Sequence, residues 1–458
     1  MTLKPQQTEA TIYTRGEHNI SRENINEPAL KVLYRLHKAG YQAFLVGGAV
    51  RDLMLDLHPK DYDVATDATP EQVKDLFRNC RLIGRRFRLA HIHYGREIIE
   101  VATFRGHYDQ AEDDSEGSTR DGMIVRDNVF GTLAEDAWRR DFSVNALYYN
   151  IADFSVVDYT GGMDDLKRRR LRMIGDANVR CQEDPVRMLR AMRFAAKLDF
   201  EFDPDLVAAI VDQHHRIEAV PPARLFEEVL KLFLSGKSQR AIHLLIQYKL
   251  LDQLFSVTQH HLFHHPEFLD FIDLACRNTD QRIAEEKPVT PAFFFAFMLW
   301  GPMSLRAKEF ESNDMSPIQA LQEAGRAVLS QQAAQISIPK RFRLPIRDIW
   351  TGQARLRNRR GRRPFSLLQH PRFRAAYDFL LLRADSIEPQ LKELGEWWTQ
   401  FQAVPEKEQK QMCQELHRMS HGQKKRKRKN PTGNHSNPDS DKPAAATDSS
   451  DSSNSSDQ

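Results

Sequence analysis

Cysteine is scarce in this chain of 458 residues, and the few cysteines are widely separated. The four of them, Cys80, Cys181, Cys276 and Cys413, form no CxxC pair. Such spacing argues against a disulfide framework and is typical of reduced thiols in a cytoplasmic protein. It also leads us to expect no zinc site.

Long apolar runs are absent as well. No apolar stretch approaches the roughly 20 residues that a membrane-spanning helix needs. The first residues, MTLKPQQTEATIY, contain no apolar core of the kind found in a secretory signal. We therefore expect a cytoplasmic protein that makes no membrane contact.

Net charge is small, at +3, but its distribution is uneven. Within residues 340–374 about a dozen lysines and arginines accompany a single acid, Asp348. A second basic run, KKRKRK at 424–429, opens a tail rich in Ser, Asp, Asn and Pro. Basic clusters favour a polyanionic partner, most often nucleic acid, although one cluster alone is equally compatible with a solvated face.

The expected elements divide the chain into an α+β part and an all-helical part. Strand and helix patterns alternate up to about residue 164, which predicts a mixed sheet with flanking helices. Beyond that point strand signals end and helical periodicity continues to about residue 418. We expect a flexible N-terminus at 1–20, the α+β part at 21–164, a helical neck at 165–235, a helical body at 236–418 and a disordered tail at 419–458.

The most informative stretch is LVGGAVRDLMLDLHPKDYDVAT, which predicts a strand, a tight turn, a helix and a second strand. Gly47 and Gly48 lack a Cβ, so their backbone N–H groups can approach an anion in front of a helix N-terminus. Arg51, one turn into that helix, adds a fixed positive charge. This part of the stretch predicts a cradle for phosphate.

Two acids follow on the second predicted strand. Asp61 and Asp63 alternate with Tyr62, so both carboxylates project from one face. Two adjacent carboxylates repel each other unless a cation holds them, and a hard ion such as Mg²⁺ fits. Either short motif alone is common by chance. Together they predict a metal clamp beside a phosphate cradle, which is equipment for chemistry at phosphorus.

The combined pattern GGxxRD-x₈-DxD resembles the head signature of the class II nucleotidyltransferases, the family of bacterial poly(A) polymerases and CCA-adding enzymes. The runs WRRDFSVNALYY and EDPVRMLRAMRF resemble two further motifs of that family. The resemblance implies a nucleotidyltransferase head at 21–164, with nucleotide-base and RNA binding in the neck and RNA binding in the body. It also implies Mg²⁺ as cofactor, with Mn²⁺ as a substitute.

The resemblance assigns roles within WRRDFSVNALYY. Asp141 becomes the third carboxylate and metal ligand beside Asp61 and Asp63, and Arg140 contacts the phosphates of the nucleotide. From the residues alone, two arginines beside an acid more often form a surface ion pair. Glu100, on EIIEVATFR, is kept outside the catalytic set because a half-buried structural role is equally plausible.

The run EDPVRMLRAMRF predicts a helix that starts at Asp184, with a proline in its first position. Spacing alone favours a basic face. The resemblance instead assigns Asp184 and Arg187 to the base of the incoming nucleotide, with Arg190 helping to position it. An acceptor paired with a donor admits adenine and cytosine and mismatches guanine and uracil. This pair therefore does not separate poly(A) polymerases from CCA-adding enzymes.

The segment GRRFRLAH resembles a basic signature of the bacterial poly(A) polymerases. An enzyme that extends unrelated RNA 3′ ends also needs contacts that ignore sequence, which basic segments supply. The predicted RNA-binding residues are Arg85, Arg86, Arg88, Arg359, Arg360, Arg362, Arg363, Lys424 and Lys425.

The resemblance therefore implies a template-independent poly(A) polymerase that adds AMP from ATP to RNA 3′-hydroxyls and releases pyrophosphate by a two-metal mechanism. The resemblance also implies that the product is tagged for RNA decay, with the decay machinery as a potential partner. The alternative is a tRNA CCA-adding nucleotidyltransferase. An alternative of another class is a non-catalytic RNA-binding protein on the same scaffold.

Overall fold

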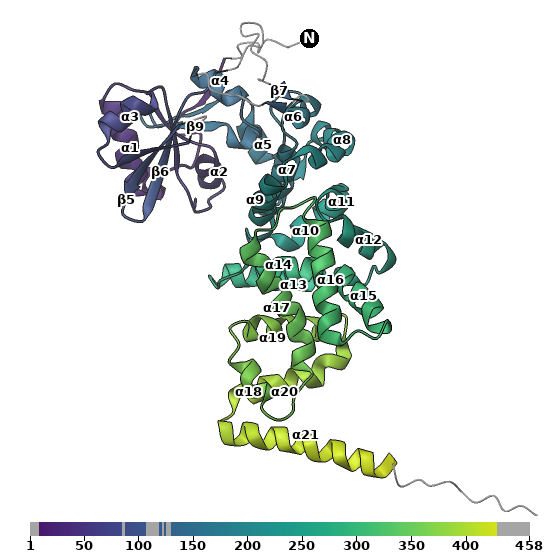
Figure 1. Cartoon of the computed structure of the whole chain (residues 1–458). Helices are drawn as coiled ribbons and strands as arrows, with labels where there is room; N and C mark the ends of the chain where they lie inside the picture. The colour runs from purple at the N-terminus through teal and green to yellow at the C-terminus, as the bar shows by residue number, and fades with distance from the viewer. Residues whose placement is uncertain (1–8, 85–87, 107–118, 121–122, 125–129, 428–458) are drawn as a thin grey trace, which may run out of the picture.

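The computed structural model describes residues 9–84, 88–106, 119–120, 123–124 and 130–427. In Figure 1 an α/β head stands at one end, and helices continue from it as an elongated column that ends at α21. Among the described residues, no helix combines the length and the apolar character needed to cross a membrane.

An eight-stranded mixed sheet forms the centre of the head, in the order β1-β10-β9-β2-β3-β6-β5-β4. Neighbouring strands are antiparallel except for β3 and β6, which are parallel. The strands are β1 (Thr11–Tyr13), β2 (Ala43–Val46), β3 (Asp63–Thr66), β4 (Cys80–Ile83), β5 (Leu89–Tyr94), β6 (Glu97–Thr103), β9 (Leu147–Asn150) and β10 (Val156–Asp158). A separate hairpin pairs β7 (Thr119–Arg120) with β8 (Met123–Ile124).

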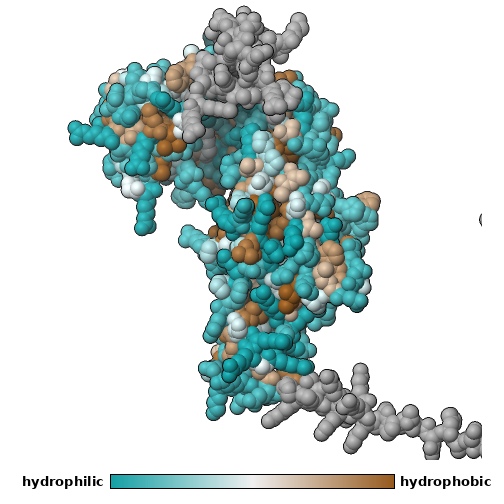
Figure 2. Space-filling model, in the orientation of Figure 1, coloured by the Kyte–Doolittle hydropathy of each residue, from teal (hydrophilic) through white to brown (hydrophobic). Residues whose placement is uncertain are grey.

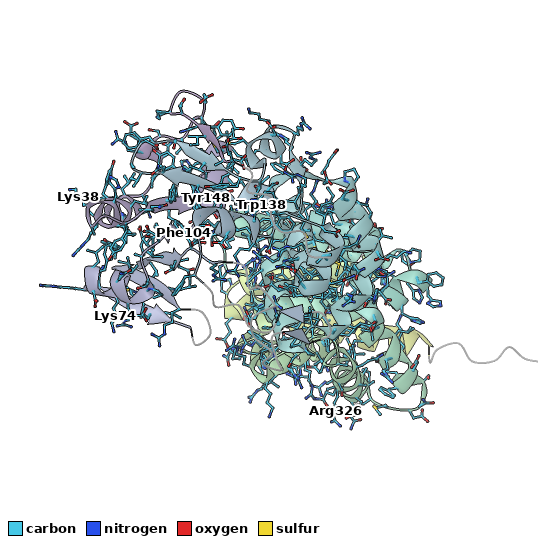
Figure 3. The ribbon with its side chains drawn as sticks, turned by 90° about the horizontal axis from the view of Figure 1, so that it is seen from above. Lys38, Lys74, Phe104, Trp138, Tyr148 and Arg326 are labelled. Carbon is cyan, nitrogen blue, oxygen red and sulfur yellow. The ribbon has the colours of Figure 1, made fainter. Side chains whose placement is uncertain are left out.

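The two faces of the sheet are covered unequally. Leu45 and Val64 point into the main core, together with the apolar side of the first long helix. Their neighbours in the chain, Phe44 and Ala65, point to the opposite face and join a much smaller cluster with Phe104 and Tyr148. Figure 3 shows Phe104 and Tyr148 on the head in a view from above. Because side chains alternate along a strand, Asp63 shares this less covered face.

Five helices accompany the sheet in the described part of the head, and side chains cap three of them. Asn26 caps the first one by accepting a hydrogen bond from the Ala29 N–H, and Thr69 and Gln72 form a capping box at the start of the third. The helices are α1 (Glu27–Lys38), α2 (Gly48–Met54), α3 (Pro70–Leu76), α4 (Leu133–Trp138) and α5 (Gly162–Lys167), with 3₁₀ turns at Arg22–Asn24 and Ser143–Asn145.

The rest of the described chain is almost entirely helical. Its core is rich in phenylalanine, as in the stacked pair of Phe226 with Phe295 and the tilted pair of Phe233 with Phe294. The helices are α6 (Ala177–Glu183), α7 (Val186–Leu198), α8 (Pro204–Gln213), α9 (Pro222–Phe233), α10 (Ser238–Gln247), α11 (Leu250–Leu254), α12 (Ser256–His264), α13 (Phe268–Ala284), α14 (Pro291–Met298), α15 (Trp300–Ser312), α16 (Pro317–Gln332), α17 (Lys340–Leu356), α18 (Arg363–Leu368), α19 (Phe373–Asp385), α20 (Lys392–Ala403) and α21 (Glu406–Lys427). Two 3₁₀ segments lie at His214–Ala219 and Pro389–Leu391.

The structure corrects three expectations. The N-terminal segment is not without structure, because β1 pairs with β10 at the edge of the sheet. Strands do not end at residue 165, because β11 (Arg170–Leu171) pairs in parallel with β12 (Glu201–Phe202). The expected tail from residue 419 begins as helix, since α21 continues to Lys427, and 428–458 lie outside the described residues. The boundaries between head, neck, body and tail remain predictions.

Candidate active site

The glycine turn is built on a conformation that glycine favours. Gly47 precedes α2 with a φ of 72°, in the left-handed region that residues with a Cβ avoid. A Cβ on Gly47 would also lie 3.4 Å from Nη1 of Arg140. Gly48 is the first residue of α2. The predicted turn in front of a helix is therefore present, and an arginine faces it.

Arg51 lies beside this turn, but it is committed to protein acceptors. Its side chain is buried, with Nε and Nη2 donating to Asp52 at 2.8 and 2.5 Å. Its Nη1 donates to the Asn145 side chain at 2.6 Å. These bonds use three of the five N–H donors of the guanidinium and hold it beside the turn, and a phosphate contact by Arg51 stays a prediction.

Arg140 is held by a different pair of residues. Its Nε donates to Tyr148 Oη at 2.8 Å, and its Nη2 donates to Asp136 at 2.9 Å. Tyr148 also donates to Asp136 at 2.6 Å. Burial alone would raise the pKa of the Asp136 carboxyl, but Arg140 and the Tyr148 hydroxyl hold that pKa below its usual range. The result is a fixed cation with Nη1 toward Gly47.

The two predicted acids precede and open β3. Asp61 lies before the strand in an exposed position, and Asp63 is its first residue, paired in register with Glu100 of β6. Solvent reaches Asp63, yet enough protein surrounds it that desolvation, followed by Glu100, raises its pKa to about 6 despite the opposing effect of Arg140. Asp61 raises this pKa further. Asp61, Asp63 and Glu100 therefore concentrate negative charge at the N-terminal end of β3.

This charge pattern fits a divalent cation, because carboxylates that raise one another's pKa are stabilised by a hard positive ion. Within the described residues, however, no three Asp, Glu, His or Cys side chains come together as a ready-made metal group. Asp61 and Asp63 are the residues that would hold the ion, and Glu100 is the acid in register with them.

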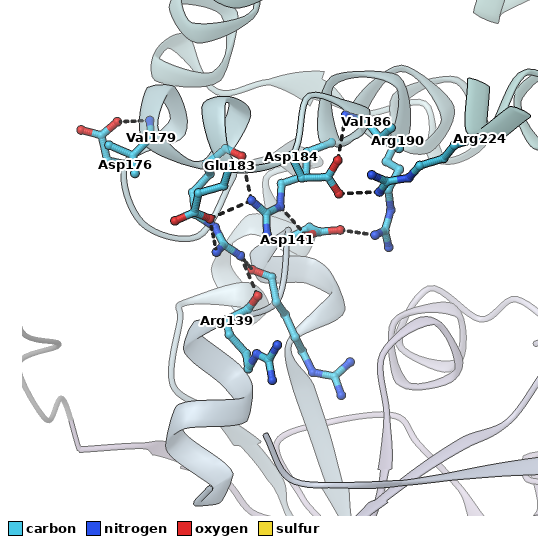
Figure 4. Close-up of polar contacts among 12 residues, drawn as sticks. Arg139, Asp141, Asp176, Val179, Glu183, Asp184, Val186, Arg190 and Arg224 are labelled. Carbon is cyan, nitrogen blue, oxygen red and sulfur yellow. Dashed lines mark hydrogen bonds and ion pairs between the residues drawn. The ribbon is translucent and has the colours of Figure 1, made fainter. Parts of the chain in front are cut away.

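Asp141, the predicted third ligand, is occupied elsewhere. It accepts from Arg187 Nε at 2.9 Å and pairs with Arg190 Nη1 at 2.5 Å, as Figure 4 shows. Burial would raise the pKa of Asp141, but Arg190 and Arg187 outweigh it and lower that pKa. In this structure two arginines from α7 neutralise Asp141, and its role as a third metal ligand beside Asp61 and Asp63 stays a prediction.

The predicted base-reading pair lies at the junction of two helices. Asp184 is the C-cap of α6, and α7 starts at Val186, one residue after the predicted first helical position at Pro185. Asp184 accepts from Arg224 at 2.7 Å and from the Val186 N–H at 3.2 Å.

Arg187 donates from Nε to Asp141, and from Nη1 to Glu183 and the Arg180 carbonyl. Its partners thus use Nε and Nη1, and Asp184 is held by a different arginine. Contacts with other side chains therefore hold both Asp184 and Arg187 in place; Figure 4 shows those of Asp184.

The predicted RNA-binding residues are spread over the head and the far end of the column. Arg88 pairs with Glu71 at 2.7 Å, and Arg359 lies over the Trp397 ring and 3.6 Å from Glu393. Arg360, Arg362 and Arg363 are exposed. Arg85 and Arg86 lie outside the described residues, as do the side chains of Lys424 and Lys425, although their backbone belongs to α21.

Several supporting residues were missed by sequence reasoning. Asp136 lies on α4 and precedes Arg140 by four residues, so helical spacing could have indicated the pair. Asn145 lies within the matched WRRDFSVNALYY run but was assigned no role. Arg224 and Lys197 contact Asp184 and Asp52 from distant helices, and nothing local in the sequence signals these contacts. Figure 2 shows a largely hydrophilic hollow between the head and the helices that supply them.

A glycine turn and clustered acids on a mixed sheet, backed by arginines from a helical column, define an RNA nucleotidyltransferase. Residues 43–172 match the family described as Poly A polymerase head domain. Residues 199–262 match "Probable RNA and SrmB- binding site of polymerase A", and 313–432 match "Polymerase A arginine-rich C-terminus". The chain belongs to the bacterial poly(A) polymerase family.

Individual relatives agree with this assignment. Poly(A) polymerase I of Salmonella typhimurium is 48% identical over 412 residues, which cover 89% of each chain. Poly(A) polymerase I of Escherichia coli O6:H1 is 48% identical over 414 residues with the same coverage. A CCA-adding enzyme of Bacillus pumilus is 36% identical over 234 residues, covering 50% of this chain and 56% of that one.

Solved structures with similar folds match most of the chain. The Bacillus stearothermophilus CCA-adding enzyme in complex with CTP has a TM-score of 0.53 at 24% identity, covering 86% of this chain and 82% of that one. The Thermotoga maritima CCA-adding enzyme complexed with tRNA has a TM-score of 0.55 at 19% identity, covering 84% and 83%. These neighbours bind RNA and nucleotide, and at this identity the likeness concerns the fold.

Proposed function

We propose that this protein adds AMP from ATP to RNA 3′ ends without a template. The observation that carries this choice is the extent of the similarity to relatives named Poly(A) polymerase I, 48% over 89% of both chains. Similarity to the CCA-adding enzyme of Bacillus pumilus covers only half of this chain. Because the reaction needs RNA and ATP together, we place it in the cytoplasm, where the product would enter RNA decay.

In the proposed reaction the RNA 3′-oxygen bonds to the α-phosphorus of ATP. The bond from that phosphorus to the bridging oxygen breaks, pyrophosphate leaves, and the hydroxyl proton is lost to solvent. Asp61 and Asp63 would hold Mg²⁺ or Mn²⁺, with Glu100 adding negative charge beside them. When bound, the ion supplies positive charge for the attacking oxygen and the departing pyrophosphate.

The chain's own groups orient the nucleotide in this proposal. Arg140 Nη1 and the N–H groups after Gly47 meet the triphosphate at the N-terminus of α2. Asp184 accepts from the amino group of adenine, and Arg187 donates to its ring nitrogen. Arg190 neutralises Asp141 and keeps Arg187 in place. A base pocket fixed in this way leaves guanine and uracil with unpaired polar groups, which disfavours them.

The first experiment offers the purified protein, with Mg²⁺, an RNA of arbitrary 3′ sequence and a tRNA that lacks its CCA end. Each nucleoside triphosphate is supplied singly and in mixture, and products are sized on a gel. We expect a long ladder on the arbitrary RNA with ATP alone. Addition that needs CTP, stops at three nucleotides and requires tRNA would instead make this chain a CCA-adding enzyme.

The acid pair is tested with Asp63→Asn, which keeps the side chain's shape and removes its charge. We expect loss of AMP addition by more than about 1,000-fold, the scale of removing charge stabilisation at a reacting phosphate. Asp75→Asn, an exposed acid on α3, is the matched control and should retain the wild-type rate. If Asp63→Asn extends RNA normally, the assignment of this acid is wrong. RNA binding with no extension by the wild-type protein would favour a non-catalytic RNA-binding role.

A further inference from the structure

The end of α12 gathers four histidines within six residues. They are His260, His261, His264 and His265, in the run HHLFHH. Residues four apart lie on the same side of a helix, so the run forms two pairs. The ring centroids are 4.6 Å apart both between His260 and His264 and between His261 and His265.

The two pairs differ in what surrounds them. His261 is half-buried and packs edge-on against Phe268, and its Nε2 lies 2.6 Å from where a Cβ on Gly301 of α15 would stand. His261 therefore serves packing between α12 and α15. His260 and His264 are both exposed, so their rings are accessible to a ligand from solution.

A hydrogen bond fixes which nitrogen of His264 can bind a ligand. Its Nδ1 lies 3.0 Å from the carbonyl oxygen of His260, and because a carbonyl can only accept, Nδ1 carries the proton. The Nε2 of the neutral ring is then left with its lone pair. Histidines that bind metals typically donate their other ring N–H to a carbonyl or carboxylate in this manner.

The charges around the pair suit a cation. The unsatisfied carbonyls at the C-terminus of a helix carry partial negative charge, and both histidines lie in the last turns of α12. The two histidines line a surface depression with a volume of about 460 Å³. Glu309 and Arg306 of α15 also line it, and because their charges are opposite they add no net charge to the site.

We propose that His260 and His264 form a two-histidine binding site for a divalent transition-metal ion such as Zn²⁺. Imidazole nitrogen suits zinc, nickel and copper, whereas Mg²⁺ prefers oxygen, so this site differs in metal class from the acids on β3. No third Asp, Glu, His or Cys joins a metal group in the part of the chain that the structure describes, so water completes the coordination. Cysteine spacing led us to expect no zinc site, and histidines on one helix supply this one.

The test is calorimetric titration of the full-length protein with Zn²⁺, with Mg²⁺ in excess to occupy oxygen sites. The variants are His260→Gln, His264→Gln and the double substitution. We expect the affinity of one Zn²⁺ site to fall by more than about 10-fold in each single variant. Loss of even a supporting partner of a metal ligand lowers metal affinity by about 10-fold to 100-fold. The double variant should lose this site.

His215→Gln is the matched control, because His215 is an exposed histidine on a different element. It should keep the wild-type titration. A second measurement uses the wild-type protein alone: Zn²⁺ should protect His260 and His264, but not His215, from acylation by diethyl pyrocarbonate, as read by mass spectrometry. Unchanged Zn²⁺ binding in the double variant, equal loss in His215→Gln, or no selective protection would each overturn the proposal.

Discussion

Arg140 owes its position to one buried acid. Asp136 accepts from Arg140 and Tyr148, and it also accepts from the backbone N–H of Arg105 at 3.2 Å. Removing the charge of Asp136 leaves a largely buried guanidinium without its counter-ion. We expect Asp136→Asn to lower the free energy of unfolding by about 3 kcal/mol, the usual cost of breaking a buried pair from one side. Urea denaturation at neutral pH measures this, with Asp75→Asn as the exposed control.

The same acid gives a pH dependence with a definite sign. The pKa of Asp136 is lower in the folded protein than in the unfolded chain, so on acidification the unfolded chain takes up the proton first. Its stabilising contribution is complete above the ordinary aspartate pKa of about 3.9 and is lost as pH falls through the lower folded pKa. The stability difference between wild type and Asp136→Asn should therefore be constant near neutrality and shrink in acid. Denaturation curves across this range measure it, and a difference that grows in acid would contradict the pairing.

At the scale of single residues, the sequence predicted which residues lie at the site better than it predicted which side chains they contact. Asp63 and Gly47 stand where the motif suggested, because alternation along a strand and the need for a positive φ are local properties. Glu100 was set aside, yet register with Asp63 brings it to the site. Asp141 was expected beside the other acids and is instead paired with arginines from α7. Both outcomes depend on pairing between distant segments, which local patterns do not encode.

At the scale of elements, α5 packs so closely on the preceding 3₁₀ turn that only glycine fits at its first residue. A Cβ on Gly162 would overlap the Ser143 carbonyl and lie 3.1 Å from Cδ2 of Leu147. We expect Gly162→Ala to lower the thermal midpoint, at a cost of about 1–3 kcal/mol for overpacking. Gly16→Ala is the matched control, since no atom lies within 4 Å of its Cβ position. Equal midpoints for the two variants would contradict this packing.

A helix whose first residues carry capping signals lies where the sequence indicates it, whereas short strands without such signals were missed. The capping box of Thr69 and Gln72, with Pro70 between them, fixed the start of α3. In contrast, β1, β11 and β12 are two or three residues long and exist because a neighbouring strand pairs with them. Segments this short carry no periodicity, so a sequence pattern cannot reveal them.

At the scale of the whole molecule, charged contacts join the head to the helical column, in addition to the apolar core that the two share. Arg187 and Arg190 of α7 pair with Asp141, and Lys197, at the far end of the same helix, pairs with Asp52 of α2 at 3.1 Å. Arg51, next to Asp52, lies with its guanidinium over the Phe194 ring of α7. One helix therefore spans from the proposed base-reading residues to the helix behind the glycine turn. In the proposed reaction, the position of this helix would therefore set how base and phosphates are aligned.

This arrangement predicts that Lys197 acts on the reaction without touching the nucleotide. Lys197→Met keeps the apolar stem of the side chain and removes its charge, while Asp52 retains Arg51 as a partner. The fold should therefore lose only about 1 kcal/mol, the upper range for a partly exposed pair. Misalignment between head and column should nevertheless slow AMP addition by about 10-fold to 100-fold, because small displacements of reacting groups are costly.

Single-turnover extension assays measure the rate, and thermal unfolding of the same samples measures the stability. Lys231→Met is the control, since Lys231 forms a similar partly exposed pair with Glu228 of the same helix, within the column alone. Slowing by Lys197→Met only, with nearly equal unfolding midpoints for both variants, would establish that the α2–α7 contact aligns the site. Equal extension rates in the two variants would contradict this role of Lys197.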